Sequence, residues 1–529
     1  MRVKQLLLLS GAFLALSTPS VFAQGEAKID PSKQDTVSTS KSGWISYFNT
    51  RNFVLPQGVS AWTAQYIGDD KKGLPRFDIN PYRSGGQVVK GGTAVLLKGA
   101  GSTKYTVNYT DEEGVPAVNN QLRGYEENHT TEGGKYYYRV VDNDSSTMFT
   151  FAYGDPTGKA FDIEAHRAYL PVQVIDIDMD NLGPISYFDS RAYQLPKGLK
   201  AGIAYNKGRE SKDRRIIGLD YIFDSDGGYK GIGIVPAGTG VIISEKEGNL
   251  PGESRHYELK VVSSNIKAPE NNFLRGSDEG GITTGGKYYY RFTISDDKKG
   301  TFEYKQHDGS AFEARPHQAY LPIPVKEVNI DNLRTITYFS GKAYQLADGL
   351  EAAIVKTNKN EPNAPLKITG EYIYKNEGVV PAKTGVLLTG NEGAYELEEV
   401  YSDKTAPAEN ELRGSDVAET TTGGEVYYRL VENDNKTGVV FEYGAENGAA
   451  YVNKANRAYL PTIKHADADK QYEISVMSIG GTVSGIDNVQ NTIPANGTIY
   501  RIDGTRVQAQ SINDLPAGIY IVNGKKIIK

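Results

Sequence analysis

The sequence predicts an all-β protein of three tandem β-sandwich modules of jelly-roll type, followed by a small C-terminal β tail domain. Short segments rich in β-branched and aromatic residues alternate with Gly, Pro, Asn and Asp, as strands and tight turns require. Of the 529 residues, 36 are tyrosine and 58 are glycine, which favours twisted strands. No stretch shows a 3.6-residue apolar period with helix caps, so helices are not expected.

One set of landmarks recurs three times and defines the modules. Each copy opens with an aromatic pair, contains Leu-Arg-Gly, continues with a tyrosine-rich strand that ends in arginine, and closes with Ala-Tyr-Leu-Pro. The pairs are Tyr47-Phe48, Tyr187-Phe188 and Tyr338-Phe339, and the closing motifs begin at Ala168, Ala319 and Ala458. Spacings of 140 and 151 residues between positions 47, 187 and 338 far exceed the roughly 20–50 residues of solenoid repeats. Each module is therefore expected to bury its own core.

These landmarks divide the chain into predicted units. We expect a signal peptide at 1–23, a flexible leader at 24–43, β modules at 44–175, 176–326 and 327–466, and a linker with a sorting-like β tail at 467–529. The signal peptide follows from Arg2 and Lys4, an apolar core from Leu6 to Leu16, and small residues up to Ala23. That core is shorter than the ~20 residues of a spanning helix, and no later segment is long and apolar enough to be one. The leader is polar and nearly free of apolar periodicity.

The second module illustrates the strand pattern. Its expected strands are Ala192–Leu195, Leu199–Tyr205, Gly231–Val235, Gly240–Ser244, Tyr257–Val262, Lys287–Ile294, Thr301–Lys305 and Ala319–Ile323. Turn-forming segments separate the strands, such as Asp296–Gly300 here and Asn433–Gly438 in the third module. The joints at 172–184 and 323–334 are short and partly apolar, which predicts strands of the following module and limited hinging.

Composition excludes several function classes. Cysteine is absent, which excludes disulfides, thiolate metal sites and cysteine nucleophiles. The formal net charge of −6 disfavours nucleic acid as a partner. The chain contains no G-x-S-x-G elbow, no H-E-x-x-H and no phosphate-binding glycine loop. We therefore expect no cofactor and favour a protein that is not an enzyme.

Two histidines align between modules. His166 and His317 stand just before Ala-Tyr-Leu-Pro, and the third module has Asn456 at this place. Asparagine can replace histidine in a turn hydrogen bond but cannot shuttle protons, so a structural role is expected.

Two acidic clusters invite a calcium interpretation. The first alternates like the start of a calcium loop and consists of Asp176, Asp178 and Asp180. Asn181 stands where the sharp-turn glycine belongs, so this is not an EF-hand. Asp224 and Asp226 precede two glycines, and an ordinary Asp-Gly turn is favoured there over a weak calcium site.

The tyrosine-rich strands carry the candidate binding residues. These are Tyr136, Tyr138, Tyr288, Tyr290, Tyr427 and Tyr428. Successive side chains of a strand point to opposite faces, so one ring or more should leave the face that its neighbours share. Such rings could stack on sugars or grip a protein surface. The alternative is cross-strand packing with hydroxyls at the rim of the core.

The C-terminus resembles a known tail. Residues 497–507 and 515–529 contain GTIYRIDGTRV and LPAGIYIVNGKKIIK. They resemble the type IX secretion sorting domain of secreted and surface proteins of the Bacteroidota. The resemblance implies a small β-sandwich that interacts with the secretion machinery, directs transport across the outer membrane and is often removed during attachment to the surface.

The modules also resemble an unnamed repeat domain that precedes such tails in surface adhesins of the same group. The matching residues include Thr337-Tyr338-Phe339, Gly349–Ala352, Val380–Leu388 and Ala458–Leu460. This resemblance implies location and no catalytic residues.

The expected function is non-catalytic. We expect a secreted or cell-surface protein whose modules bind glycan or protein ligands weakly and multivalently, because several weak sites on one chain gain avidity. Two alternatives stay open: a hydrolase of glycans or peptides with its site in one module, and a structural surface stalk.

Overall fold

All described residues lie in strands, turns or irregular segments. The computed structural model describes residues 33–132, 136–142, 149–153, 160–179, 183–211, 214–225, 227–228, 233–246, 255–284, 288–294, 300–304, 311–422, 426–443, 450–462, 471–478, 499–501, 505–507, 519–522 and 525–528. These residues contain no helix, and their sheets are antiparallel but for one strand pair. The all-β prediction is confirmed.

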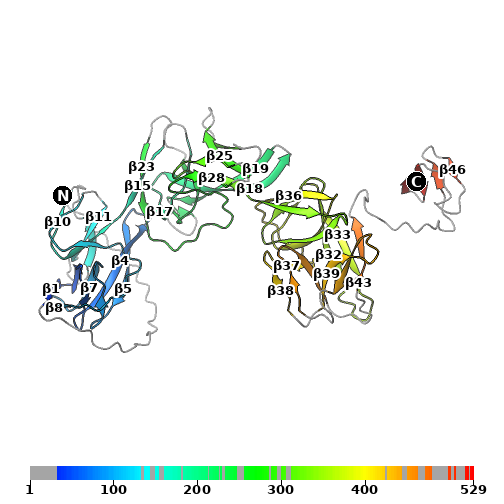
Figure 1. The fold of residues 1–529 in the computed structure, drawn as a ribbon. Helices are drawn as coiled ribbons and strands as arrows, with labels where there is room; N and C mark the ends of the chain where they lie inside the picture. The colour runs from blue at the N-terminus through cyan, green and yellow to red at the C-terminus, as the bar shows by residue number, and fades with distance from the viewer. Residues whose placement is uncertain are drawn as a thin grey trace.

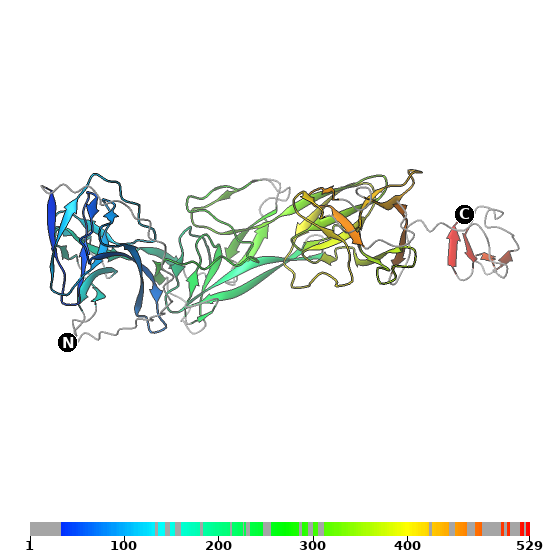
Figure 2. The same cartoon turned by 90° about the horizontal axis from the view of Figure 1, so that it is seen from below.

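Each repeat stacks a central sheet between a front sheet and a back sheet. The repeats follow one another along an elongated molecule (Figures 1 and 2). A small two-stranded ladder accompanies each back sheet. The packing is that of β-sandwiches in which the central sheet is covered on both faces.

In the first repeat the front, central and back sheets have the orders β1-β8-β3-β6, β2-β7-β4-β5 and β12-β11-β14-β9. The strands are β1 Gln34–Ser38, β2 Trp44–Tyr47, β3 Phe53–Val54, β4 Ser60–Asp69, β5 Pro75–Arg83, β6 Val88–Val89, β7 Val95–Lys98, β8 Lys104–Tyr109, β9 Arg123–Tyr125, β10 His129–Thr130, β11 Tyr137–Asp142, β12 Phe149–Tyr153, β13 Asp162–Ile163 and β14 Arg167–Pro171.

In the second repeat the orders are β15-β23-β17-β21, β16-β22-β18-β19-β20 and β26-β25-β28. The strands are β15 Val174–Met179, β16 Ile185–Tyr187, β17 Tyr193–Gln194, β18 Leu199–Ser211, β19 Arg214–Asp224, β20 Gly227–Gly228, β21 Ile234–Val235, β22 Val241–Glu245, β23 Arg255–Val261, β24 Gly281–Ile282, β25 Tyr288–Ile294, β26 Gly300–Tyr304, β27 Glu313–Ala314 and β28 Tyr320–Ile323.

In the third repeat the orders are β29-β36-β31-β34, β30-β35-β32-β33-β44 and β37-β42-β39-β40-β43. The strands are β29 Val325–Ile330, β30 Thr335–Ser340, β31 Tyr344–Gln345, β32 Glu351–Thr357, β33 Ile368–Lys375, β34 Val379–Val380, β35 Thr384–Thr389, β36 Gly393–Glu399, β37 Arg413–Gly414, β38 Glu419–Thr420, β39 Val426–Glu432, β40 Val439–Tyr443, β41 Val452–Asn453, β42 Ala458–Thr462, β43 Gln471–Tyr472 and β44 Ile474–Ser478.

Continuous apolar triplets mark the central sheets. In Val95-Leu96-Leu97, the first and third side chains enter the front core and the second enters the back core. Val241–Ile243 and Val386–Leu388 divide in the same way between the two cores of their repeats. Side chains of a strand alternate between the two faces of the sheet. A strand that is covered on both faces therefore needs apolar residues at successive positions.

One core crosses a repeat boundary, which corrects an expectation. The back core of the first repeat contains Leu96, Tyr138 and Leu170, and it also contains three buried side chains of the second repeat. These three are Ala192, Ile234 and Val262. The expectation that each module buries its own core is therefore wrong at this boundary. Apolar side chains at the adjoining end of the second repeat complete the core of the first.

The expected flexible leader contains a strand. β1 pairs along all five residues with β8, and its Val37 side chain is 3% exposed in the front core. The leader prediction is wrong for this segment, because backbone ladder bonds and one buried valine suffice to order a polar strand at a sheet edge. The equivalent strands β15 and β29 come from the apolar joints, as predicted, and they span the predicted boundaries at 175/176 and 326/327.

The eight strands expected in the second module are present with shifted ends. β19 was not predicted. It pairs with β18 in the longest hairpin of the repeat and reaches the third repeat. The turn predicted at Asn433–Gly438 is also present, with a left-handed Lys436 at φ 55°. The turn predicted at Asp296–Gly300 lies largely outside the described residues.

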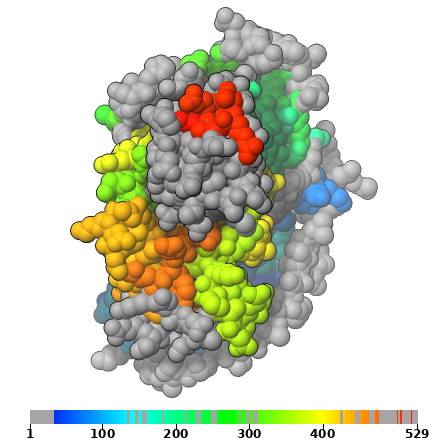
Figure 3. Space-filling view, turned by 90° about the vertical axis from the view of Figure 1, so that its right-hand side faces the viewer, coloured from blue at the N-terminus to red at the C-terminus, as the bar shows by residue number. Residues whose placement is uncertain are grey.

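The predicted tail contains a four-stranded sheet in the order β46-β45-β47-β48. The strands are β45 Ile499–Arg501, β46 Arg506–Val507, β47 Ile519–Val522 and β48 Lys525–Ile528. Figure 3 shows described residues of this tail as a red patch in front of the third repeat. The predicted signal peptide lies outside the described residues. The predicted end of the third module at residue 466 is wrong, because β43 and β44 pair with strands of the third repeat. Residues 479–498 of the predicted linker lie outside the described residues. No helix in the described ranges has the length and apolarity needed to cross a bilayer.

Candidate functional site

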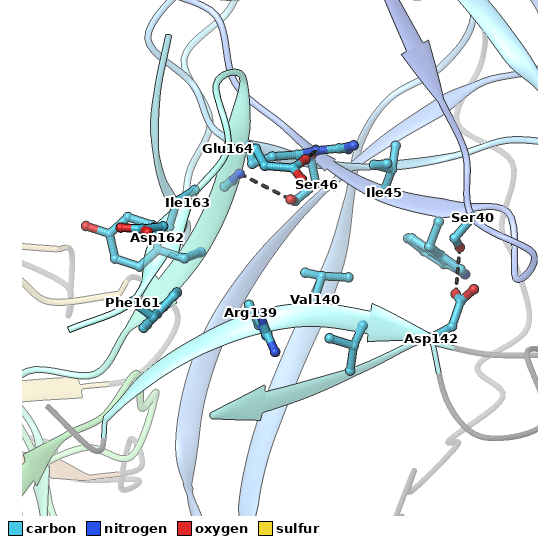
Figure 4. Close-up of a pocket in the computed structure, with 15 residues that line it drawn as sticks. Ser40, Ile45, Ser46, Arg139, Val140, Asp142, Phe161, Asp162, Ile163 and Glu164 are labelled. Carbon is cyan, nitrogen blue, oxygen red and sulfur yellow. Dashed lines mark hydrogen bonds and ion pairs between the residues drawn. The ribbon is translucent and has the colours of Figure 1, made fainter. Parts of the chain in front are cut away.

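A cleft of about 320 Å³ opens beside the back sheet of the first repeat. Figure 4 looks into it: Ser46 and Glu164 lie at the top, Phe161 at the left, Arg139 at the bottom and Asp142 at the right. These residues come from β2, β11 and the segment from 161 to β14, which are far apart in sequence. The cleft is therefore a product of sheet packing.

The third repeat forms the same cleft from the equivalent residues. This second cleft also measures about 320 Å³. The strand pairing of the two back sheets shows which residues are equivalent: Tyr138 pairs with Leu170 in the first repeat, and Tyr428 pairs with Leu460 in the third. The corresponding lining pairs are Ser46 and Thr337, Arg139 and Arg429, Asp142 and Glu432, Phe161 and Tyr451, Glu164 and Lys454, and Arg167 and Arg457. We call these the first and third clefts.

Strand geometry explains why an arginine enters each cleft. Tyr138 and Val140 of β11 face the back core, so Arg139 between them points to the opposite face. The second wall is an edge strand in each cleft. Among the described strands, β2 pairs with β7 alone and β30 pairs with β35 alone. This edge leaves room for the cleft.

Each cleft holds two guanidinium groups in different states. Arg167 Nη1 donates to the Ser46 carbonyl oxygen at 3.4 Å, and Arg457 Nη1 donates to the Thr337 carbonyl oxygen at 3.2 Å. Arg139 and Arg429 are exposed, and neither makes a hydrogen bond or an ion pair with any residue in the described ranges. A guanidinium anchored to the backbone, beside one with no hydrogen-bond or ion-pair partner among the described residues, suits an anionic ligand.

The acidic side chains of the first cleft already have partners. Asp142 Oδ1 accepts hydrogen bonds from the Ser40 and Ser42 hydroxyls. Burial pushes the pKa of Asp142 upward, but these hydrogen bonds outweigh it and hold the pKa below its usual value. Asp162 Oδ1 accepts from the Thr130 hydroxyl at 2.6 Å, and Glu164 pairs with Arg167 at 3.5 Å.

The third cleft is more basic than the first. Lys454 replaces Glu164, and Val452 replaces Asp162. An anion should therefore meet less repulsion in the third cleft.

In the second repeat the equivalent arginine is occupied. Arg291 Nη2 donates to the Glu313 carbonyl oxygen at 2.7 Å, and its guanidinium lies 5.4 Å from the centre of the Phe312 ring. Gln318 stands where the other repeats have the anchored arginine. The second repeat thus lacks the guanidinium pair.

The six predicted binding tyrosines do not form an exposed platform. Tyr138, Tyr290, Tyr427 and Tyr428 are 2%, 7%, 4% and 1% exposed. Tyr138, Tyr290 and Tyr428 lie in the back cores of their repeats, where the packing alternative expected such rings. Tyr427 points to the other face of its strand and packs against Tyr451 and Tyr459.

The other two predicted tyrosines lie at repeat boundaries. Tyr136 donates to Glu258 and Tyr288 to Glu396, so their hydroxyls contact the next repeat. The third repeat has Val426 at this position, which shows that Tyr427 and Tyr428 are not the full counterparts of the predicted pairs.

The aligned histidines occupy a left-handed turn. His166, His317 and Asn456 have φ of 59°, 54° and 56°. His166 Nδ1 lies 3.1 Å from the Phe48 carbonyl oxygen, His317 Nδ1 lies 3.1 Å from that of Phe188, and Asn456 Nδ2 donates to that of Phe339 at 3.3 Å. All three side chains contact the same backbone position of their own repeat.

Asp189, Asp278 and His317 lie close enough together to suggest a metal site. Asp189 is 0% exposed and accepts from Arg191 Nε and Nη2 at 2.9 Å each and from the Tyr187 hydroxyl at 3.2 Å. These bonds account for the buried carboxylate without an ion.

The predicted acidic clusters have local partners. Asp176 and Asp178 flank the two ring nitrogens of His256 at 3.0 Å each. Asp224 pairs with Lys246, and Asp180 and Asp226 lie outside the described residues. The described part of neither cluster has the geometry of a calcium loop.

The arginines at the ends of the tyrosine-rich strands recur in the sequence, but no role was predicted for them. The recurrence of these arginines is visible in the sequence, whereas the fold decides that Arg139 lines one cleft with Arg167, and Arg429 another with Arg457. No protein-family model, curated protein or solved structure matches this chain.

Proposed function

We propose that this protein is an exported, non-catalytic binding protein that holds acidic glycans weakly and multivalently in its first and third clefts. The observation that carries the proposal is the duplication of one cleft, with its guanidinium pair, in two repeats of one chain. Two weak sites on a common frame raise apparent affinity through effective concentration.

The chemistry of the clefts favours a carboxylate-bearing sugar. The available guanidinium of Arg139 or Arg429 can bind a carboxylate through two parallel hydrogen bonds. Phe161 or Tyr451 supplies an aromatic face for a sugar ring. A volume of about 320 Å³ lies at the low end for small-ligand sites, which suits one sugar unit.

The hydrolase alternative receives less support. Its site should gather unpaired carboxylates in one repeat only. In the first cleft Asp142, Asp162 and Glu164 have partners, and the third cleft has Lys454 in place of Glu164. Release of reducing ends from a bound glycan would revive this alternative.

A glycan array probed with the mature chain tests the proposal. We expect the protein to be retained on glycans that contain uronic or sialic acids. The double variant Arg139→Ala with Arg429→Ala should no longer be retained. Each single variant should lose about 10-fold or more of the apparent affinity, since avidity gains reach roughly 10²–10⁴-fold. Arg291→Ala is the matched control, because its guanidinium is already occupied.

The other outcomes discriminate between ligand classes. Retention on neutral glycans that survives the double substitution contradicts the proposal. Retention on acidic peptides alone would assign the clefts to a protein ligand, and binding to neither class would favour the surface stalk.

The proposal includes location at the cell surface. Its supports are the signal-like residues 1–23 and the resemblance of the tail to a type IX sorting domain. Fractionation of native cells, with and without residues 499–529, provides the test. Periplasmic retention of the intact protein would contradict surface location.

A further inference from the structure

Two joints with the same plan connect the three repeats. In the first joint the Asp69 amide donates to Gln194 Oε1 at 2.5 Å, and Gln194 Nε2 donates to the Asp69 carbonyl oxygen at 3.0 Å. The Ser263 amide donates to the Tyr66 carbonyl oxygen at 2.9 Å. These bonds join the end of the β4–β5 hairpin to the front sheet of the second repeat.

The second joint uses the equivalent atoms. The Arg209 amide donates to Gln345 Oε1 at 2.7 Å, and the Tyr401 amide donates to the Asn206 carbonyl oxygen at 2.7 Å. A β-bulge precedes Asp69 in β4 and Arg209 in β18. Each bulge holds a glycine of positive φ, Gly68 at 101° and Gly208 at 107°. The glycine brings the backbone against the glutamine, since an added Cβ would lie 2.9 or 3.0 Å from its Oε1.

The ion pairs of the two joints have opposite polarity. In the first joint Asp69 of the preceding repeat binds Lys260 of the following repeat at 2.6 Å. In the second joint Arg209 of the preceding repeat binds Glu398 of the following repeat, with Nε to Oε1 at 2.9 Å. Lys260 and Glu398 are equivalent, because they pair with Gln194 and Gln345 in the same register.

These charged groups are largely removed from water. Lys260 and Asp69 side chains are 20% and 16% exposed, and those of Arg209 and Glu398 are 18% and 2% exposed. A mispaired joint would place like charges together with little screening, which costs far more than the same contact at an exposed surface.

The free ends of the array lack the joint residues. At the positions of Gln194 and Lys260 the first repeat has Val54 and Asn108. Ala64, Ala204 and Val355 occupy equivalent positions of the three hairpins. Four residues later the first and second repeats have the bulge glycine, whereas the third repeat has Lys359. It also has Val426 where the others have the joint tyrosine.

The third repeat also covers a strand edge. β44 pairs in parallel with five residues of β33, the outer strand of the hairpin that corresponds to β4–β5. This pairing occupies the backbone groups of that edge.

We propose that the joints form a directional, charge-coded interface through which each repeat docks only on its own neighbour, and that the outer ends of the first and third repeats are capped against end-to-end docking with another copy of the chain. The partner of each joint surface is one specific neighbouring repeat of this chain. The inference is independent of any ligand in the clefts.

Distance measurements in the full mature chain test the charge code. The chain has no cysteine, so spin labels can be attached selectively at Lys104→Cys and Glu313→Cys, which are exposed residues on either side of the first joint. We expect a narrow distance distribution, broadening in Asp69→Arg and in Lys260→Glu, and a narrow distribution again in the double variant. The double variant should recover the narrow distribution, because it places a cation on the preceding repeat and an anion on the following repeat, as in the second joint.

Two controls keep the test decisive. Asp111→Arg changes an exposed charge of the first repeat and should leave the distribution narrow. Gln194→Ala is a milder variant that removes the amide bonds without reversing a charge, and it should also broaden the distribution. Narrow distributions in all single variants, or a double variant as broad as the singles, would overturn the charge code.

Sedimentation velocity tests the capped ends. The mature chain should remain one species of constant sedimentation coefficient from low to high micromolar concentration. End-to-end chains that grow with concentration would overturn the capping.

Discussion

The hydroxyl of Tyr136 donates a hydrogen bond to the carboxylate of Glu258 across the first repeat boundary, and Tyr288 does the same to Glu396 at 2.7 Å across the second. Both tyrosines belong to the tyrosine-rich segments that by sequence alone suggested a binding platform. Their position explains why the third repeat, which has no following repeat of its kind, has Val426 there.

Tyr288→Phe should lower the free energy of unfolding by about 0.5–1.5 kcal/mol, because it removes one intramolecular hydrogen bond and keeps the ring. Burial, and then the Glu396 carboxylate, raise the pKa of Tyr288 to about 12, so this bond persists at neutral pH. Urea denaturation measures the loss. The control Tyr395→Phe removes a bond to Asn391 within one repeat and should leave inter-repeat distances unchanged.

Glu398→Ala should destabilise the second joint by about 3–5 kcal/mol, because it leaves Arg209 and Arg215 without their buried partner. Burial raises the pKa of Glu398, but hydrogen bonds from Arg215 and Arg209 outweigh it and hold the pKa below its usual value. A depressed pKa stabilises the fold above the ordinary carboxyl value of about 4.3, and this contribution is lost as pH falls through the folded value.

Denaturation at pH 7 and below pH 4 measures that contribution. Glu398→Gln should flatten the acid limb of the stability profile. An acid limb identical to that of the wild type would show that other carboxyl groups produce it.

Gly208→Ala should cost about 1–3 kcal/mol, because φ is 107° and the new Cβ would meet Gln345 Oε1 at 3.0 Å. Gly58→Ala is a matched control, with φ of 79° and nothing within 4 Å of the added Cβ. Chemical denaturation of both variants separates backbone strain from crowding of the joint. Equal losses would mean that the contact with Gln345 contributes nothing.

His166→Asn should stay within about 0.5 kcal/mol of the wild type, because Asn456 occupies the same left-handed turn of the third repeat. His166→Val should lose about 1–3 kcal/mol, since a β-branched residue is strained at φ near 59° and cannot bond the Phe48 carbonyl. Thermal unfolding ranks the two. A large loss in His166→Asn would indicate a need for the imidazole itself.

Charge exchange between the clefts should move their affinities for an acidic glycan in opposite directions. Glu164→Lys should strengthen the first cleft and Lys454→Glu should weaken the third, each by about 1.5–5-fold for an exposed charge. Titration calorimetry in an Arg429→Ala or Arg139→Ala background reads one cleft at a time. Insensitivity to both exchanges would exclude ionic recognition in the clefts.

Local patterns predicted much of the fold. Triplets such as Val95–Leu97 mark strands that are covered on both faces, and the Asn433–Gly438 turn follows from the φ values that its residues tolerate. Gln34–Ser38 was missed because a polar edge strand gains its order from a partner, β8, that lies some 70 residues away.

The sequence by itself determined the β class, the recurrence of one plan in three repeats and the turn at Asn433–Gly438, because side-chain alternation and backbone preference act between near neighbours. Tertiary structure alone decided that Asp69 meets Lys260, 191 residues away, and that Arg139 and Arg167 face one cleft. Such contacts depend on which sheet faces and hairpin ends pack together. The repeat pattern does not reveal them, because it is the same whichever charge occupies the joint position.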